Sequence, residues 1–148
     1  MDFRARPNND YLLNAKWQEL YVLTEHWQSD LEFFKDELSF FQTLFDKYFQ
    51  YLIAEENIKE TKITAALFEA VKAEQTALNM QVARHLIHIS ELMKNPFVQN
   101  EPQFRAEHIA LETRFVEFVK CFRDIKQKLF SIAERSSKVE KNKHQLAP

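Results

Sequence analysis

A heptad repeat of apolar residues near the start of the chain most constrains its fold. Alternating steps of four and three residues meet an apolar residue at eleven of twelve positions. The positions are Leu13, Trp17, Leu20, Thr24, Trp27, Leu31, Phe34, Leu38, Phe41, Phe45, Tyr48 and Leu52. Such a repeat is typical of a long helix with coiled-coil-like packing. We therefore predict one long helix over residues 9–55.

The absence of glycine points in the same direction. The chain has 148 residues and no glycine. Glycine supplies the backbone conformations with positive φ that hairpins and bulges require. A β-sheet protein of this length without glycine would be very unusual. We therefore predict an all-α fold with few turns.

Two further apolar stripes predict helices over residues 58–94 and 102–136. The second helix should bury Leu67, Val71, Leu78, Val82, Ile89 and Leu92, and the third Phe104, His108, Leu111, Phe115, Phe118, Phe122, Ile125, Leu129 and Ile132. Pro96 should end the second helix, because proline disfavours helical conformation in the preceding residue. Residues 137–148 carry no apolar stripe, so we predict a frayed basic tail there.

Short turns make neighbouring helices antiparallel. We therefore predict one domain over residues 1–148, an elongated up-down-up bundle of three long antiparallel helices. The first helix has a second, wider stripe that includes Phe33 and Phe40. A helix with two such faces contacts two neighbours or a second chain. This stripe suggests a homodimer that completes a larger bundle, or another protein partner.

Charge and composition exclude several classes of function. The net charge of −2 argues against a general nucleic-acid binder. No apolar run approaches the ~20 residues of a membrane span, and the first ten residues lack the apolar segment of a secretory signal. The single cysteine, Cys121, cannot form an internal disulfide, which suits a reducing compartment. We predict a cytoplasmic protein that binds neither membrane nor nucleic acid, with Cys121 as a buried structural thiol.

Histidines give the strongest indication of a site. The first turn should centre near residue 56 and the second near residue 98 or 99, which brings residues of all three helices to one height. The residues are His26 and Asp30 on the first helix, His85 and His88 on the second, and His108 and Glu112 on the third. Each pair is three or four residues apart, so both of its side chains lie on one helix face.

Three interpretations of these six residues remain open. Four imidazoles and two carboxylates in a bundle could bind a divalent metal ion, either Zn or Fe/Mn. They could instead form a structural polar layer in which a carboxylate satisfies each buried histidine and the layer fixes helix register. They could also line a solvent-filled pocket or a partner surface. The corresponding functions are an interaction, scaffold or regulatory module, and alternatively a metal-binding oxidoreductase or metal sensor.

Two stretches carry a resemblance to known proteins. HWQSDLEFFKDELSFF, residues 26–41, together with RHLIHISEL, residues 84–92, resembles a group of small uncharacterised bacterial helical-bundle proteins. The resemblance implies a helical bundle and no particular activity.

Overall fold

The computed structural model describes residues 16–53, 58–94 and 101–146, and the side chains within 16–48, 58–94 and 101–135. These residues form three helices: α2 (Trp17–Ile53), α3 (Ile58–Lys94) and α4 (Glu101–Leu146). Every described residue except Lys16 is helical. The predicted all-α fold is confirmed.

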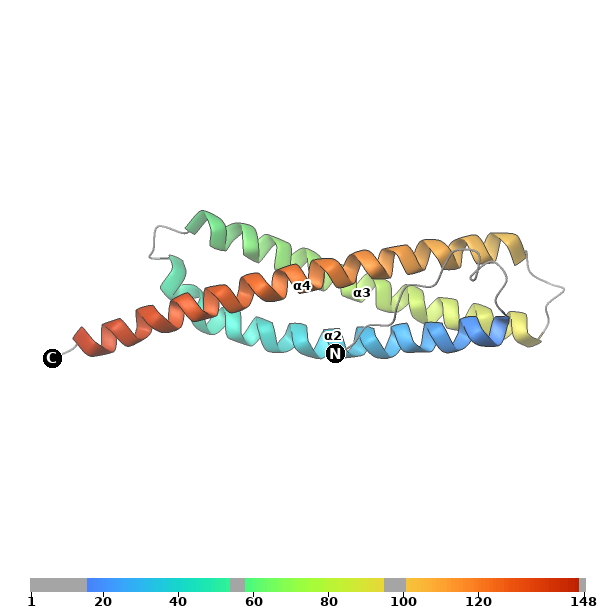
Figure 1. The fold of residues 1–148 in the computed structure, drawn as a ribbon, viewed down its shortest axis with the longest axis horizontal. Coiled ribbons are helices and arrows are strands. Elements are labelled where there is room, and N and C mark those ends of the chain that lie inside the picture. The colour runs from blue at the N-terminus through green and yellow to red at the C-terminus, as the bar shows by residue number, and fades with distance from the viewer. Residues whose placement is uncertain (1–15, 54–57, 95–100, 147–148) are drawn as a thin grey trace.

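The three helices lie alongside one another in an elongated rod (Figure 1). Helices α2 and α4 run in one direction and α3 runs in the opposite direction, which is the predicted up-down-up order. The C-terminal part of α4 projects past the ends of the other two helices.

The observed helix bounds agree with the sequence in the middle of the chain and differ from it at the ends. Helix α3 has the predicted bounds. Helix α2 is described as far as Ile53, and residues 9–15 and 54–55 of the predicted helix lie outside the described part of the chain. Helix α4 continues to Leu146, although we predicted an end at residue 136 and a frayed tail. Residues 137–146 contain no glycine or proline and are rich in lysine. Intrinsic helix propensity can therefore extend α4 where no apolar stripe does.

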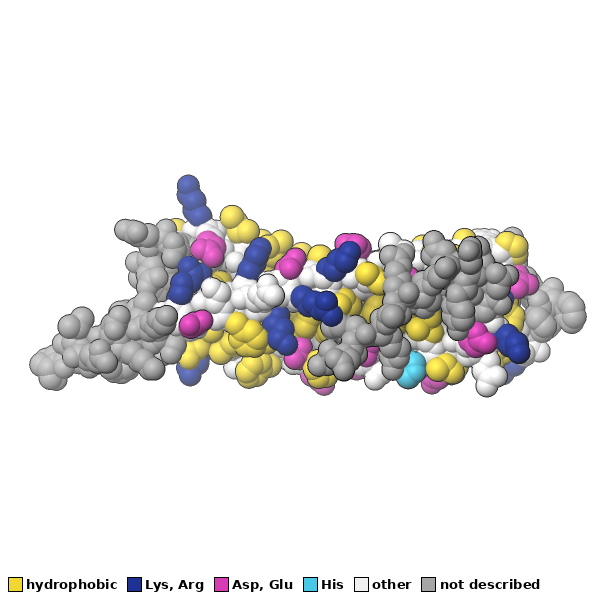
Figure 2. All heavy atoms as spheres, viewed as in Figure 1, with side chains coloured by type: hydrophobic (Ala, Val, Ile, Leu, Met, Phe, Trp, Pro, Cys, Tyr) yellow, Lys and Arg dark blue, Asp and Glu magenta, His cyan; other side chains and the backbone are white. Residues whose placement is uncertain are grey.

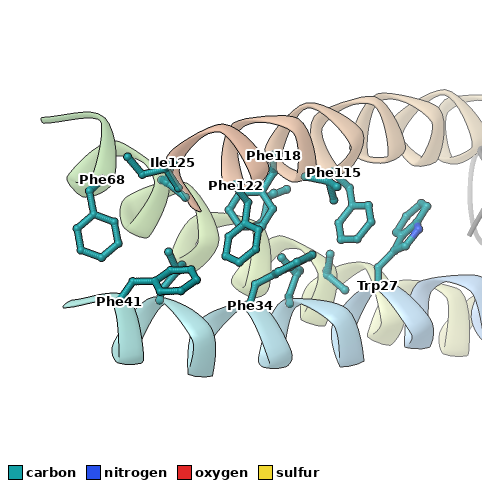
Figure 3. Close-up of a cluster of buried hydrophobic side chains, with 14 of the residues drawn as sticks. Trp27, Phe34, Phe41, Phe68, Phe115, Phe118, Phe122 and Ile125 are labelled. Carbon is teal, nitrogen blue, oxygen red and sulfur yellow. The ribbon is translucent and has the colours of Figure 1, made fainter. Parts of the chain in front are cut away.

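The heptad seams of α2 and α4 pack with buried residues of α3, including Phe68, to form the main core, which is strongly aromatic (Figure 3). Phe34 packs against both Phe118 and Phe122, with ring centroids 5.4 and 4.5 Å apart. All nine positions of the predicted α4 seam are buried. The described α2 seam is buried from Leu20 to Phe41 and partly buried beyond it.

A second, smaller apolar cluster lies at the end of the rod where α2 begins. It consists of Leu20, Ile89, Leu92 and Phe104. The main cluster reaches Trp27, Val82 and Leu111 on the respective helices. His85 and His108 lie between these two sets of residues along α3 and α4 and form a polar layer there, while the partly buried Leu23 of α2 packs against both clusters.

Two predicted core residues lie at the surface instead. Leu67 is exposed, because the buried stripe of α3 passes through its neighbours Thr64 and Phe68. Cys121 is also exposed and lies beside the buried Phe122. In both cases the buried stripe of the helix passes one position away from the residue.

Candidate functional site

His85 and His108 meet in the interior of the rod. His85 is 8% exposed and His108 is fully buried. Nε2 of His85 and Nδ1 of His108 are 2.7 Å apart, a hydrogen bond between α3 and α4. Either ring can donate, because the two roles depend on the tautomer of each imidazole.

Aromatic rings surround the histidine pair. Trp27 of α2 stacks on His108 with ring centroids 4.9 Å apart. Phe104 stacks on His85 at 4.5 Å, with the two ring planes 5° from parallel. His88 meets Phe104 edge-on, with centroids 4.6 Å apart. The hydrogen-bonded pair is therefore enclosed by stacked rings from α2 and α4, and side chains of all three helices meet at this height.

Burial keeps both imidazoles neutral at pH 7. It lowers the pKa of His85 to about 4, with a smaller contribution from the nearby His88. It lowers the pKa of His108 to about 3, with smaller contributions from His85 and Arg105. Loss of hydration disfavours the charged form of each ring. A positive charge on a neighbouring side chain disfavours it further by repulsion.

The other nitrogen of His108 is also buried. Its Nε2 atom has no hydrogen-bond partner among the described residues. Glu112 is buried one helical turn further along α4. A buried polar atom without a partner typically costs about 1–3 kcal/mol. The hydrogen bond to His85 offsets part of the cost of burying this ring.

The six residues of the predicted site are distributed over this region unequally. His85 and His108 are in contact, and His88 lies one turn from His85 on the same side of α3. His26 and Asp30 are half-buried on α2. His26 directly precedes Trp27, and Asp30 lies three residues after it. The part of the chain that the structure describes contains no group of three or more His, Cys, Asp or Glu side chains that could hold a metal ion. Metal binding stays a prediction.

A polar groove opens beside the histidine pair between α3 and α4. Its volume is about 440 Å³. It is lined by Gln81, Arg84, His85, His88, Glu107, Ala110, Leu111 and Arg114. At one end, Arg114 donates two hydrogen bonds to Glu74 of α3, including one of 3.0 Å from Nη2 to Oε2. This bidentate pair separates the polar groove from a more apolar one of about 510 Å³ further along the same two helices.

The sequence did not reveal the aromatic contribution to this site. Trp27 and Phe104 were assigned to apolar seams, and Trp27 also to an aromatic cluster with Trp17 and Tyr21 near the histidines, yet stacking on the imidazoles was not predicted. Seam position does not distinguish a ring that packs on aliphatic groups from one that packs on an imidazole.

A second candidate surface lies between α2 and α4. Phe33 and Phe40 of α2 and Phe130 of α4 are 42%, 60% and 45% exposed, and we call these three residues the aromatic patch. Phe40 and Phe130 both lie against the buried Phe41, with centroids 5.9 and 5.5 Å from it. An ion pair of 3.6 Å between Glu37 and Lys126 crosses from α2 to α4 in the same region.

Hydrophobic side chains also gather visibly on the face of the rod drawn in Figure 2, among lysine, arginine and acidic side chains. None of the described helices is long and apolar enough to cross a membrane. No protein-family model, curated protein or solved structure matches the chain. The resemblance to small bacterial helical proteins therefore stays a prediction.

Proposed function

We propose that the protein is an interaction module, a three-helix rod that binds another protein through the aromatic patch. The observation that supports this is the exposure of Phe33, Phe40 and Phe130 on two adjacent helices. Folded proteins rarely leave large apolar groups together in water unless they form a binding surface. Aromatic side chains are enriched at protein interfaces. The partner surface would be apolar at its centre.

The charges near the patch favour a defined orientation of the partner. The ion pair of Glu37 and Lys126 joins the same two helices as the phenylalanines. Both side chains are partly exposed, so a partner can offer hydrogen bonds to them at the edge of an apolar contact. Interfaces commonly combine an apolar centre with such a polar rim.

In this proposal the histidine layer is structural and keeps the binding surface rigid. The hydrogen bond between His85 and His108 joins α3 to α4, and Trp27 adds α2 by stacking. A polar pair in an apolar seam is satisfied in one register of the helices only, as a single polar residue is in a coiled coil. Fixed register holds α2 and α4 at the spacing that forms the patch.

The alternative function is binding of Zn or Fe/Mn by the histidine layer. Its support is the proximity of two neutral imidazoles and the buried carboxylate of Glu112. Zinc sites need three or four protein ligands. The described geometry joins two nitrogen atoms by a hydrogen bond, so we favour the structural role.

Site-specific photocrosslinking tests the interaction module directly. Benzoyl-phenylalanine in place of Phe33 should give a discrete adduct with another protein in cells that make the chain. Phe40→Ser in the same chain should abolish the adduct, because it removes the most exposed ring of the patch. Val22→Ser is the matched control, since Val22 of α2 is also exposed but lies outside the patch.

Helix content measured by circular dichroism should be equal in all of these variants. An adduct that survives Phe40→Ser, or the absence of any adduct, would refute the proposed binding surface. An adduct of twice the chain mass would assign the patch to self-association instead.

A further inference from the structure

Helix α3 has a second heptad seam on the side that faces away from the core. Steps of four and three residues along α3 connect ten positions, which we call the outer seam. They are Lys59, Ile63, Ala66, Ala70, Ala73, Ala77, Met80, Arg84, Ile87 and Glu91. Seven are apolar, and the charged residues are confined to the two ends and one position between them. This is the pattern of a helix that packs against another helix.

Within the described part of the rod, the outer seam is not buried against α2 or α4. Its three large apolar side chains, Ile63, Met80 and Ile87, are 61%, 52% and 61% exposed. Its other members are exposed too, except for the half-buried Ala77. The buried residues of α3 follow a different stripe, from Thr61 through Phe68 to Leu92. Helix α3 thus has one seam for its own chain and one without an occupant among the described residues.

We propose that the outer seam binds a second copy of this chain, with the two α3 helices antiparallel and a two-fold axis beside Ala73 and Ala77. The seam alternates between two sets of heptad positions, one beginning with Lys59, Ala66 and Ala73 and the other with Ile63, Ala70 and Ala77. Antiparallel pairing places each member of one set opposite a member of the other set in the second copy. Ile63 then faces Ile87 of the second copy, and Met80 faces its Ala70. A two-fold axis repeats each of these contacts, as in most homodimers.

The sizes of the seam residues are complementary in this register. The large Met80 lies opposite a small alanine, so neither a clash nor a void results. Ala73 lies opposite Ala77 at the axis, where small side chains allow the two helices to approach closely. Ile63 and Ile87 close both ends of the apolar stretch.

The charges of the seam select both the direction and the register. Lys59 lies opposite Glu91 of the second copy, and the symmetry produces this ion pair twice. Parallel helices would instead align Lys59, Arg84 and Glu91 each with its own like charge. An antiparallel shift of one heptad in one direction would place Arg84 opposite Lys59, and a shift in the other direction would place Glu91 opposite Ala66, so both shifts lose the ion pair. None of the three residues forms an ion pair with another described residue, so these charges are available to a second chain.

The outer seam runs along nearly the whole of α3. From Lys59 to Glu91 it spans about 48 Å at 1.5 Å per residue. The aromatic patch lies on α2 and α4, so a dimer formed through α3 leaves the patch free for another protein. The proposed dimer therefore does not depend on the proposed function.

Measurement of the mass in solution tests the dimer. Light scattering after size exclusion should give twice the 17.7 kDa chain mass for the whole protein. Ala73→Glu should raise the dissociation constant by at least about 100-fold, because it buries two unpaired carboxylates at the axis. Ala73 is exposed in the single rod, so helix content should not change. Phe40→Glu, on the aromatic patch, is the control and should stay dimeric.

A charge exchange tests the direction of the helices. Lys59→Glu should weaken the dimer, and adding Glu91→Lys to it should restore the original dissociation constant. Parallel helices would show no such rescue, because both variants would keep like charges opposed. In a Cys121→Ser background, Ile63→Cys with Ile87→Cys should form disulfide-linked dimers on oxidation and neither single variant should, whereas parallel helices would also link each single variant to its own copy. These two positions are about 36 Å apart within one chain and cannot join there.

Three results would overturn the inference. One is a monomeric wild-type protein at roughly 100 μM, a concentration at which a micromolar dimer would be almost fully formed. Another is a dimer that Ala73→Glu leaves intact. The third is a dimer that only Phe40→Glu disrupts, which would assign self-association to the aromatic patch.

Discussion

Acidification should destabilise the protein through its buried histidine pair. Burial holds the pKa of His85 near 4 and that of His108 near 3, whereas an unfolded chain titrates histidine near 6.5. Below pH 6.5 the unfolded state therefore binds more protons than the folded state. The free energy of unfolding decreases as the pH is lowered, until the pH reaches the pKa values of the folded state. At pH 5 each histidine is about 1.5 pH units below its unfolded pKa, which costs about 2 kcal/mol. The pair together should cost about 4 kcal/mol, a large share of the typical 5–15 kcal/mol of a whole domain.

A paired variant isolates this contribution. His85→Leu together with His108→Leu removes both titrating groups and strands no partner, so it should change stability little at pH 7. Urea denaturation at pH 7 and pH 5 gives the free energy of unfolding of both proteins. The wild type should lose about 4 kcal/mol more than the variant between the two pH values, because the carboxylates contribute equally to both. Equal losses in the two proteins would refute the assignment of a buried neutral pair.

Three further outcomes follow from the core, the layer and the surface. Phe41→Ala or Phe118→Ala should each cost about 3–5 kcal/mol in urea denaturation, because both rings are buried in the main core; a loss below about 1 kcal/mol would contradict this packing. Zinc or a chelator should leave the melting temperature unchanged, whereas a rise with zinc that His85→Ala abolishes would establish the metal alternative. Glu74→Gln breaks the ion pair to Arg114. It should cost no more than about 1 kcal/mol, because both side chains are partly exposed; a larger loss would show that this pair is part of the core.

The sequence was most informative where a strict repeat met a buried surface. The seam of α4 was predicted at every position because a heptad pattern and a helix face repeat together over many turns. For α3 the same reasoning failed at Leu67, since its many alanines and threonines make two neighbouring stripes nearly equal in apolar content. Phe68 and Gln75, which are buried, were missed for the same reason.

The sequence could predict the approximate level of the histidines along the rod. It could not predict how each helix is rotated about its own axis. Counting from the turns placed His85 level with about residue 112 and His88 level with about residue 109, whereas His85 contacts His108, one turn away from the counted level. The rotation of each helix about its own axis depends on how whole side chains pack, and counting along the chain carries no information about it. Trp27, not His26, therefore turned out to be the α2 residue that stacks on His108.

The polar layer also divides the rod into regions that should exchange amide hydrogens at different rates. Among the described residues, the cluster on one side has four buried apolar members, Leu20, Ile89, Leu92 and Phe104, and the cluster on the other side is several times larger. The smaller cluster has few contacts to lose, and opening it would expose one neutral histidine pair to water. That end of the rod should open in local fluctuations that leave the phenylalanine core closed. Native-state exchange should then show two plateaus of protection, with the boundary at the level of His85 and His108.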